Sequence, residues 1–448
     1  MGAKFVNIDR DTPMLLPCDL RDWVKDNDLA AFVLEAVETT DLTGAHVNHR
    51  GTGSAEYPSA MMLALLIYCY ATGVFSSRKI ERATYDSISV RYLCANEHPD
   101  HDTIAKFRRR NRDLVEKVFM QVLELAGHMG LLKLGTIYID GTKLQGNADS
   151  TKNLTIAQID EELKRLRVEV KDLLGKADEQ DRQNSDADGT LLPEELGQRE
   201  RRKVLLEAAK SKLEERLERL EKSRKESAKR SCRKDREVTS GRKADPDKEQ
   251  ARRDKDRQRQ RINPNDPDSY AMPVRKGGFV QGYNAQASVD AEGVGLIVGA
   301  YVTNQPTDRQ ELEPNLNHLS PEHLKEVRLV AADKGYYNRP SMIDLEKAHD
   351  LRMVVPPTHQ NRKEKQRYSK DHPREIEKRY KDKLMRRLKT NQGQSIYQKR
   401  NIFSEGTFAT IKNAIGLNRF RLKGLEGVHI EWLLTAIAHN CRKIIAFG

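Results

Sequence analysis

Two apolar runs constrain the fold of this chain more than any other feature, because each of them stops at a single aspartate. The first is "GTIYIDGTKL" (135–144) and the second is "EVRLVAADKGYYN" (326–338). Both are rich in β-branched residues and read as buried strands. Each is expected to end at its aspartate, Asp140 or Asp333, and to turn through a nearby glycine. An aspartate before a glycine is often only a turn residue, so neither one identifies a site by itself.

The order of the predicted elements indicates an α/β domain with a mixed sheet. After the first strand come a strand hairpin over 282–305, a helix near 309–319, the second Asp strand, a helix, a further strand and C-terminal helices. Residues 1–134 read mostly as helices. We therefore expect an α-helical N-terminal domain over 1–134 and an α/β domain over 135–448.

A highly charged segment, residues 151–262, interrupts the α/β domain. Its apolar residues recur at helical spacing over 159–173 and again over 206–220, which predicts an antiparallel helical hairpin. Residues 224–262 have hardly any apolar side chains and are expected to be flexible. The segment is therefore predicted to be an insertion.

The net charge of +12 makes a polyanion such as DNA or RNA a natural partner. Residues 351–400 hold sixteen Lys plus Arg against five Asp plus Glu, nearly the whole excess. That stretch is either a phosphate-binding region or a solvated basic linker. Arg108, Arg109 and Arg110 crowd a second basic helix, which either lies on DNA or is an amphipathic helix with a charged outer face.

The aspartates suggest a metal site. If the two Asp strands lie side by side and parallel, Asp140 and Asp333 meet at the carboxyl edge of the sheet, where open α/β sheets bind ligands. Two adjacent carboxylates repel each other, so a cation between them is expected. Oxygen ligands favour Mg²⁺ or Mn²⁺ over zinc. A site with two such ions can activate water and stabilise the leaving oxygen of a phosphodiester.

Cysteine usage and hydropathy point to a reducing, non-membrane setting. The five cysteines form no Cys-x-x-Cys pair, which fits the cytoplasm. The apolar stretch 61–75 is too short to span a bilayer and is expected to be a buried helix.

Seven stretches together resemble a known family. They are "SSRKIERA", "HDTIAKFR", "IDGTKLQGNA", "NPNDPDS", "QGYNAQASVD", "AADKGYYN" and "SEGTFATIKNAIGLNRFRLKG", and they run in this order from about residue 75 to 445, outside the charged segment. In this respect the chain resembles the DDE transposases of bacterial insertion sequences, most closely insertion-sequence group 1182.

The resemblance implies a ribonuclease H-like catalytic domain with Asp140, Asp333 and Glu405 as catalytic metal ligands. Glu405 is implied to open a C-terminal helix. The Tyr-Arg-Glu-Lys signature of the family falls on Tyr397, Arg400, Glu405 and Lys412. Arg400 stands one residue further from Glu405 than the pattern expects, and Ala409 replaces the usual glycine.

The resemblance also extends the set of expected DNA contacts. The candidates are Lys143, Lys334, Tyr397, Arg400, Lys412, Arg419, Arg108, Arg109 and Arg110.

The function implied is a transposase that cuts the ends of its element with two Mg²⁺ or Mn²⁺ ions and directs the freed 3′-hydroxyl at target DNA. Its partners would be the terminal inverted repeats, target DNA and a second copy in a homodimeric paired-end complex, in the bacterial cytoplasm at the nucleoid. Three alternatives remain: a nuclease of the same fold without strand transfer, a domesticated DNA-binding protein without catalysis, and a coiled-coil scaffold.

Overall fold

The structure is a computed structural model. It describes residues 28–46, 56–183, 191–235, 246–274, 277–357 and 373–448, and also the single residues 19, 22, 24 and 25. None of the helices in these ranges is both long and apolar enough to cross a membrane.

The described chain begins with a group of helices. They are α1 (Leu29–Glu38), α2 (Ser59–Ala71), α3 (Ser77–Asp86), α4 (Ile88–Leu93), α5 (His101–Arg110) and α6 (Arg112–His128). Most residues of α2 are buried, as its nearly uniform apolar sequence predicts for a helix enclosed on all sides. It packs against α16 (Gly424–Phe447), the last helix of the chain, which also packs against α6. One apolar core therefore runs from the N-terminal helices into the sheet domain.

Six strands form one mixed sheet in the described residues. They are β1 (Thr136–Gln145), β2 (Tyr270–Pro273), β3 (Phe279–Asp290), β4 (Ile297–Thr303), β5 (Leu329–Ala332) and β6 (Arg352–Val354). The order is β2-β3-β1-β5-β6, with β4 also paired to β3. β3 is antiparallel to β1, β2 and β4, whereas β5 is parallel to both β1 and β6. The parallel neighbours expected for the two Asp strands are thus confirmed.

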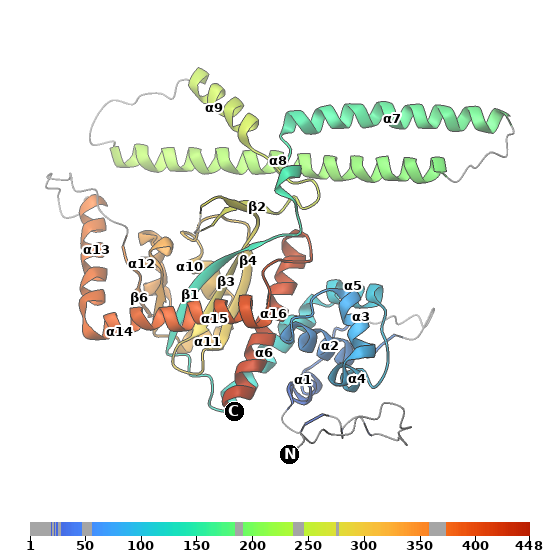
Figure 1. Cartoon of the computed structure of the whole chain (residues 1–448). Coiled ribbons are helices and arrows are strands. Elements are labelled where there is room, and N and C mark those ends of the chain that lie inside the picture. The colour runs from blue at the N-terminus through green and yellow to red at the C-terminus, as the bar shows by residue number, and fades with distance from the viewer. Residues whose placement is uncertain are drawn as a thin grey trace, which may run out of the picture.

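Helices cover the sheet. Those that follow β4 and β5 are α10 (Leu312–Asn317), α11 (Pro321–Glu326) and α12 (Arg339–Ala348), and those that follow β6 are α13 (Pro373–Lys389), α14 (Asn391–Arg400), α15 (Gly406–Ala409) and α16. The segment from α14 to α15 crosses in front of the sheet (Figure 1), and the turn between these helices contacts β1 and β3. This crossing brings the C-terminal signature residues over β1.

Three charged helices lie between β1 and β2: α7 (Ile156–Gln183), α8 (Leu191–Asp235) and α9 (Pro246–Arg259). In Figure 1, α7 and α8 lie side by side, away from the sheet. Ile159 and Leu163 of α7 share a small buried cluster with Leu206 and Leu213 of α8.

The expectation that residues 224–262 are flexible is wrong for much of that stretch. α8 continues to Asp235, and α9 is helical from Pro246 to Arg259. Arg224 of α8 pairs with Asp256 of α9, and Arg253 Nε lies 3.4 Å from Glu221 Oε1. Ion pairs rather than apolar contacts hold α9 against α8. The spacing of apolar residues in the sequence gives no information about such ion pairs.

Candidate active site at the carboxyl edge of the sheet

Asp140 and Asp333 lie side by side at one edge of the sheet. The parallel register pairs Ile139 of β1 with Ala332 of β5, and each aspartate is the next residue in its chain. β5 ends there as expected, and the Asp333 side chain accepts a hydrogen bond from the Lys334 amide, which starts a short 3₁₀ turn. Both aspartates therefore lie where the pairing of β1 with β5 ends, at the carboxyl end of β5.

The prediction that the first strand ends at Asp140 is wrong. β1 continues to Gln145, and Gly141 to Gln145 pair with β3 from Gln286 back to Gly282. Gly141 therefore does not form a turn but lies within the strand. A β-carbon at residue 141 would collide with the side-chain amide of Gln286, so Gly141 leaves room for that amide.

Asp140 is almost enclosed. Its side chain is 13% exposed, its Oδ1 accepts the Gly141 amide at 2.8 Å, and its Oδ2 lies 3.3 Å from Arg400 Nη1. Burial raises the pKa of Asp140 to about 6, with smaller upward contributions from the charges of Asp333 and Asp308, while the Gly141 amide and Arg400 act in the opposite direction. An enclosed carboxylate beside two others is a position where added positive charge is stabilising.

The helical segment over residues 391–415 carries the signature residues. Thr390 caps its start by accepting the Gly393 amide at 3.0 Å, and Gly416, with φ of 86°, ends it. Glu405 does not open a helix, which corrects the expectation. It is the last residue of a π-helical turn, Asn401–Glu405, inside this continuous segment.

The structure brings some signature residues to the aspartates and leaves one apart. The Arg400 guanidinium contacts Asp140 and lies 5.5 Å from the centre of the Tyr397 ring. Lys412 Nζ donates to Thr142 Oγ1 at 2.6 Å. The Glu405 side chain is exposed. Across the described ranges, no three His, Cys, Asp or Glu side chains are grouped closely enough to hold a metal ion.

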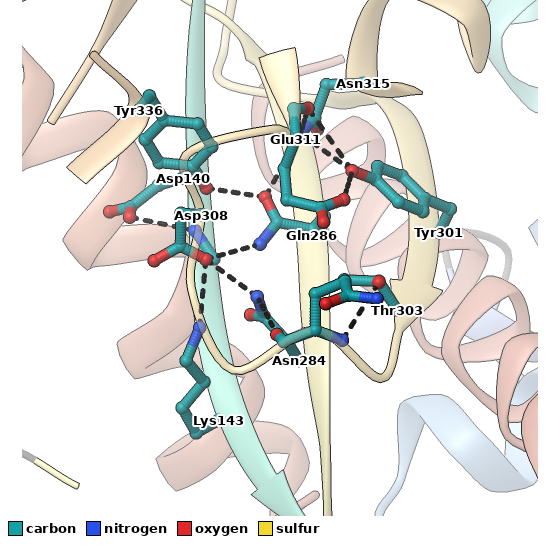
Figure 2. A network of polar contacts seen from close by, with 12 residues as sticks. Asp140, Lys143, Asn284, Gln286, Tyr301, Thr303, Asp308, Glu311, Asn315 and Tyr336 are labelled. Atoms are coloured by element: carbon teal, nitrogen blue, oxygen red, sulfur yellow. Dashed lines mark hydrogen bonds and ion pairs between the residues drawn. The ribbon is translucent and has the colours of Figure 1, made fainter. Parts of the chain in front are cut away.

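Asp308, in the loop after β4, also belongs to the site. Its Oδ1 accepts hydrogen bonds from Lys143 Nζ at 2.9 Å and from Asn284 Nδ2 at 2.7 Å. Gln286 Nε2 is a third donor to the same oxygen, at 3.0 Å. Figure 2 shows Asp308 beside Asp140, with these donors converging on it.

Buried partners hold this network in place. Gln286 Oε1 accepts hydrogen bonds from Tyr336 Oη at 2.5 Å and Asn315 Nδ2 at 3.1 Å, and Tyr301 Oη donates to Glu311 Oε2 at 2.6 Å (Figure 2). All five side chains are 5% exposed or less. A buried hydrogen-bonded network of this kind restricts side-chain positions.

One sequence signal could have found Asp308. β4 is antiparallel to β3, which is antiparallel to β1, so β4 runs in the same direction as β1. The loop after β4 therefore starts at the same edge of the sheet as Asp140. The predicted strand hairpin over 282–305 already contained this information.

The remaining candidate DNA contacts differ in accessibility. Lys334 is exposed, Lys143 is held by Asp308, and Arg419 Nε donates to the Gly146 carbonyl at 3.2 Å. Arg109 and Arg110 are exposed on α5.

Arg108 corrects the expectation of a DNA contact. It is only 4% exposed, and its Nη1 donates to Tyr70 Oη at 2.9 Å and to the Phe75 carbonyl at 3.1 Å. The side of α5 that carries Arg108 faces α2 and the turn after it, so this guanidinium is part of the interior.

Two families match parts of this chain. Residues 18–110 match the family described as transposase domain (DUF772), and residues 256–441 match the family described as transposase DDE domain. Asp333 and Glu405 lie inside the second match, and Asp140 lies between the two. Searches of curated proteins and of solved structures gave no significant match.

The second family carries structural and chemical information. A transposase DDE domain implies the ribonuclease H-like fold, which is consistent with the mixed sheet observed, and enzymes with this domain generally use divalent metal ions. The two families occur in the expected order, helical domain first. The chain is therefore a DDE transposase of the insertion-sequence type, an enzyme that cleaves and transposes DNA.

Proposed function

We propose that Asp140 and Asp333 are the metal ligands of this transposase and that Glu405 completes the catalytic triad. The main support is the parallel pairing of β1 with β5, in which Ile139 lies beside Ala332 and both aspartates follow directly. Two oxygen-donor side chains at one sheet edge match the needs of a phosphoryl-transfer site.

The donor chemistry fits a hard cation. Mg²⁺ is commonly held by one or two carboxylates, with water and substrate phosphate completing its coordination. Burial raises the pKa of Asp140, and the neighbouring Asp333 adds to that rise, so positive charge between the two is favourable. We propose two ions, Mg²⁺ or Mn²⁺, which when bound would activate a water molecule and stabilise the leaving oxygen of the phosphodiester.

Arg400 is proposed to contact the phosphate that is cut. Its side chain is 8% exposed and already neutralises part of the charge of Asp140. A guanidinium in this position can turn its donors to a phosphate oxygen, with which it forms paired hydrogen bonds. Lys412, bonded to Thr142 two residues beyond Asp140, is proposed as a second phosphate contact. The other proposed DNA contacts are Lys143, Lys334, Tyr397, Arg419, Arg109 and Arg110.

The π-helical turn supports the assignment of Glu405. One residue more than the family pattern separates Arg400 from Glu405, and the i to i+5 turn over Asn401–Glu405 absorbs one extra residue. In such a turn, residues five apart occupy similar positions around the axis, as residues four apart do in an α-helix. Glu405 makes no ion pair among the described residues, so its carboxylate is available to a metal ion.

Finer assignments follow the same reasoning. We propose membership of insertion-sequence group 1182, transfer of the freed 3′-hydroxyl to target DNA, recognition of terminal inverted repeats, and a homodimer in the paired-end complex, in the cytoplasm at the nucleoid. We also propose that residues 1–134 form a helical DNA-binding domain, that 135–448 form the ribonuclease H-like catalytic domain, and that 151–262 is a helical-hairpin insertion in the second.

The test uses Asp140→Asn, Asp333→Asn and Glu405→Gln in the full chain. Each change removes one ligand charge and little volume, so binding of an end-containing duplex without metal should persist while Mg²⁺-dependent cleavage is lost. Because ligands of one site act as a unit, each single variant should lose about as much activity as the triple variant. Asp344→Asn, an exposed carboxylate on α12, is the control. Cleavage within about tenfold of the parent would remove that residue from the triad.

A further inference from the structure

A second basic site lies where α8 and α9 meet the sheet. A cavity of about 660 Å³ opens there between α8, the chain after α9, β2 and the loop after β4. We call it the arginine groove and define it by Arg216, Arg219, Arg259, Arg261 and Tyr270. None of the described residues that line the cavity is acidic.

The groove has a fixed guanidinium at its centre. Arg216 lies 3.6 Å from the centre of the Tyr270 ring. Its Nη1 and Nη2 each donate at 3.2 Å, to the carbonyls of Arg261 and Pro267. Burial lowers the pKa of Arg216, with the Tyr270 and Asp268 charges acting in the opposite direction. The guanidinium is thus held in place by carbonyls and a ring.

The surrounding charges are only partly compensated. Arg219 lies 3.2 Å from Glu215 in an exposed pair one helical turn away. Asp268, whose charge acts on Arg216, is bonded to Lys212 at 2.6 Å. Arg259 and Arg261 are exposed and make no ion pair within the described ranges. A concave surface with one sign of charge concentrates ions of the opposite sign, so the groove is expected to attract an anion.

The junction beneath the groove is well ordered by hydrogen bonds. Leu154 and Ile262 exchange backbone hydrogen bonds of 2.9 Å in both directions where the charged segment leaves and rejoins the sheet domain. The buried Asn263 donates to the Asp149 carbonyl at 2.7 Å and to Asn153 Oδ1 at 2.9 Å. These bonds join the chain after α9, which lines the groove, to the chain that follows β1.

The groove and the aspartates share one loop. Gln305 lines the cavity, and Asp308 in the same loop belongs to the network beside Asp140. Asn284 Nδ2 bridges the two by donating to the Gln305 carbonyl at 3.2 Å and to Asp308 Oδ1 at 2.7 Å. The groove and the network beside Asp140 are therefore linked through this loop and Asn284.

We propose that the arginine groove binds the sugar-phosphate backbone of DNA beside the phosphate that is cut. Arginine forks match phosphate oxygens, and the amide side chains along the cavity can donate to phosphate and sugar. No base edge is needed for these contacts, so the groove orients DNA and adds affinity for any sequence. The inference rests on the DNA transposase family of the chain and not on the proposed metal ligands.

The experiment compares two double variants of the full chain. Arg259→Gln with Arg261→Gln removes two exposed groove charges that make no ion pair with any described residue. Arg201→Gln with Arg252→Gln removes one exposed charge from α8 and one from α9, both outside the groove. Binding of a fluorescent random-sequence duplex is measured in EDTA at several salt concentrations, and a thermal melt checks that each variant is folded.

The groove variant should bind roughly tenfold more weakly for each lost contact, and the slope of log affinity against log salt should fall by about 0.9 for each. The control should retain the parental slope. Equal slopes for both variants, or a parental slope in the groove variant, would overturn the proposal. Two controls separate this outcome from failure of the metal site. Binding is measured in EDTA, where no metal ion is bound, and Asp140→Asn is measured in parallel, because neither the metal ion nor its proposed ligand is expected to contribute to duplex binding under these conditions.

Discussion

Replacement of Arg108 by methionine should destabilise the protein without a specific loss of DNA affinity. The guanidinium is buried and donates to Tyr70 Oη and the Phe75 carbonyl, with a longer hydrogen bond of 3.4 Å to Ser77 Oγ. Methionine fills much of the same volume but donates nothing. The Phe75 carbonyl and the Tyr70 hydroxyl would then each lose this donor in an enclosed environment.

The cost can be worked out from these contacts. Leaving a buried polar group unpaired costs about 1–3 kcal/mol, and two groups lose their donor here. Burial raises the pKa of Glu431, and the charge of Arg108 partly offsets this, so the variant also leaves that buried carboxylate less well compensated. Together these effects suggest about 3–5 kcal/mol. At about 2 °C per kcal/mol for a large domain, the melting temperature should fall by roughly 6 °C or more.

The assay pairs thermal unfolding with duplex binding at several salt concentrations. Arg109→Gln with Arg110→Gln is the matched control, because both side chains are exposed on the same helix. The control should keep its melting temperature and lose salt-dependent affinity, the reverse of Arg108→Met. Arg108→Lys should fall between parent and methionine variant, since it keeps the charge but not the planar fork. A parental melting temperature for Arg108→Met together with weakened DNA binding would refute the reasoning.

Three further outcomes are expected. Arg386→Gln with Lys389→Gln, two exposed cations of α13, should lower the salt slope of DNA binding by about 0.9 for each phosphate contact, and an unchanged slope would make α13 a solvated face. Asp308→Asn should reduce cleavage by about 10–100-fold and weaken Mn²⁺ binding, because an amide oxygen cannot accept hydrogen bonds from all three donors that Asp308 now binds. An Asp308→Asn variant with parental Mn²⁺ affinity would contradict this prediction. Burial lowers the pKa of His439 to about 4, so its contribution to stability, on the order of 3 kcal/mol, is present above pH 6.5 and lost as the pH falls toward 4. Melting temperatures of His439→Gln and parent that fell in parallel over that window would contradict this.

Much of the sheet could be predicted from local patterns. The apolar runs at 137–139 and 329–332 predict buried strands, and the structure buries Ile137, Ile139, Val330 and Ala332 in one cluster and Tyr138 and Ala331 in another. The order of elements predicted the mixed sheet, since a hairpin is antiparallel and a strand reached through a helix is usually parallel. These features depend on near neighbours in the chain, which is why the sequence alone reveals them.

The surroundings of the site depended on residues far apart in the chain. Whether β1 stops at Asp140 depends on how far β3 extends beside it. Whether Asp308 is a turn residue or part of the site depends on the direction in which β4 returns along β3. The predicted hairpin gives the direction of β4 relative to β3, but the pairing of β3 with β1 joins residues far apart in the chain, so local sequence could not supply it.

Arg108 and Arg109 show, within one helix, the same difference between what local sequence determines and what tertiary packing determines. Composition and periodicity identify both as basic residues of α5, and the sequence by itself determined that this helix would be amphipathic and charged. Only the packing of α5 against α2 and the turn at Phe75 decided that Arg108 is enclosed while Arg109 stays in water. Local sequence determines the direction in which a side chain points from its helix. The tertiary structure determines whether that side chain then faces solvent, DNA or the interior of the protein.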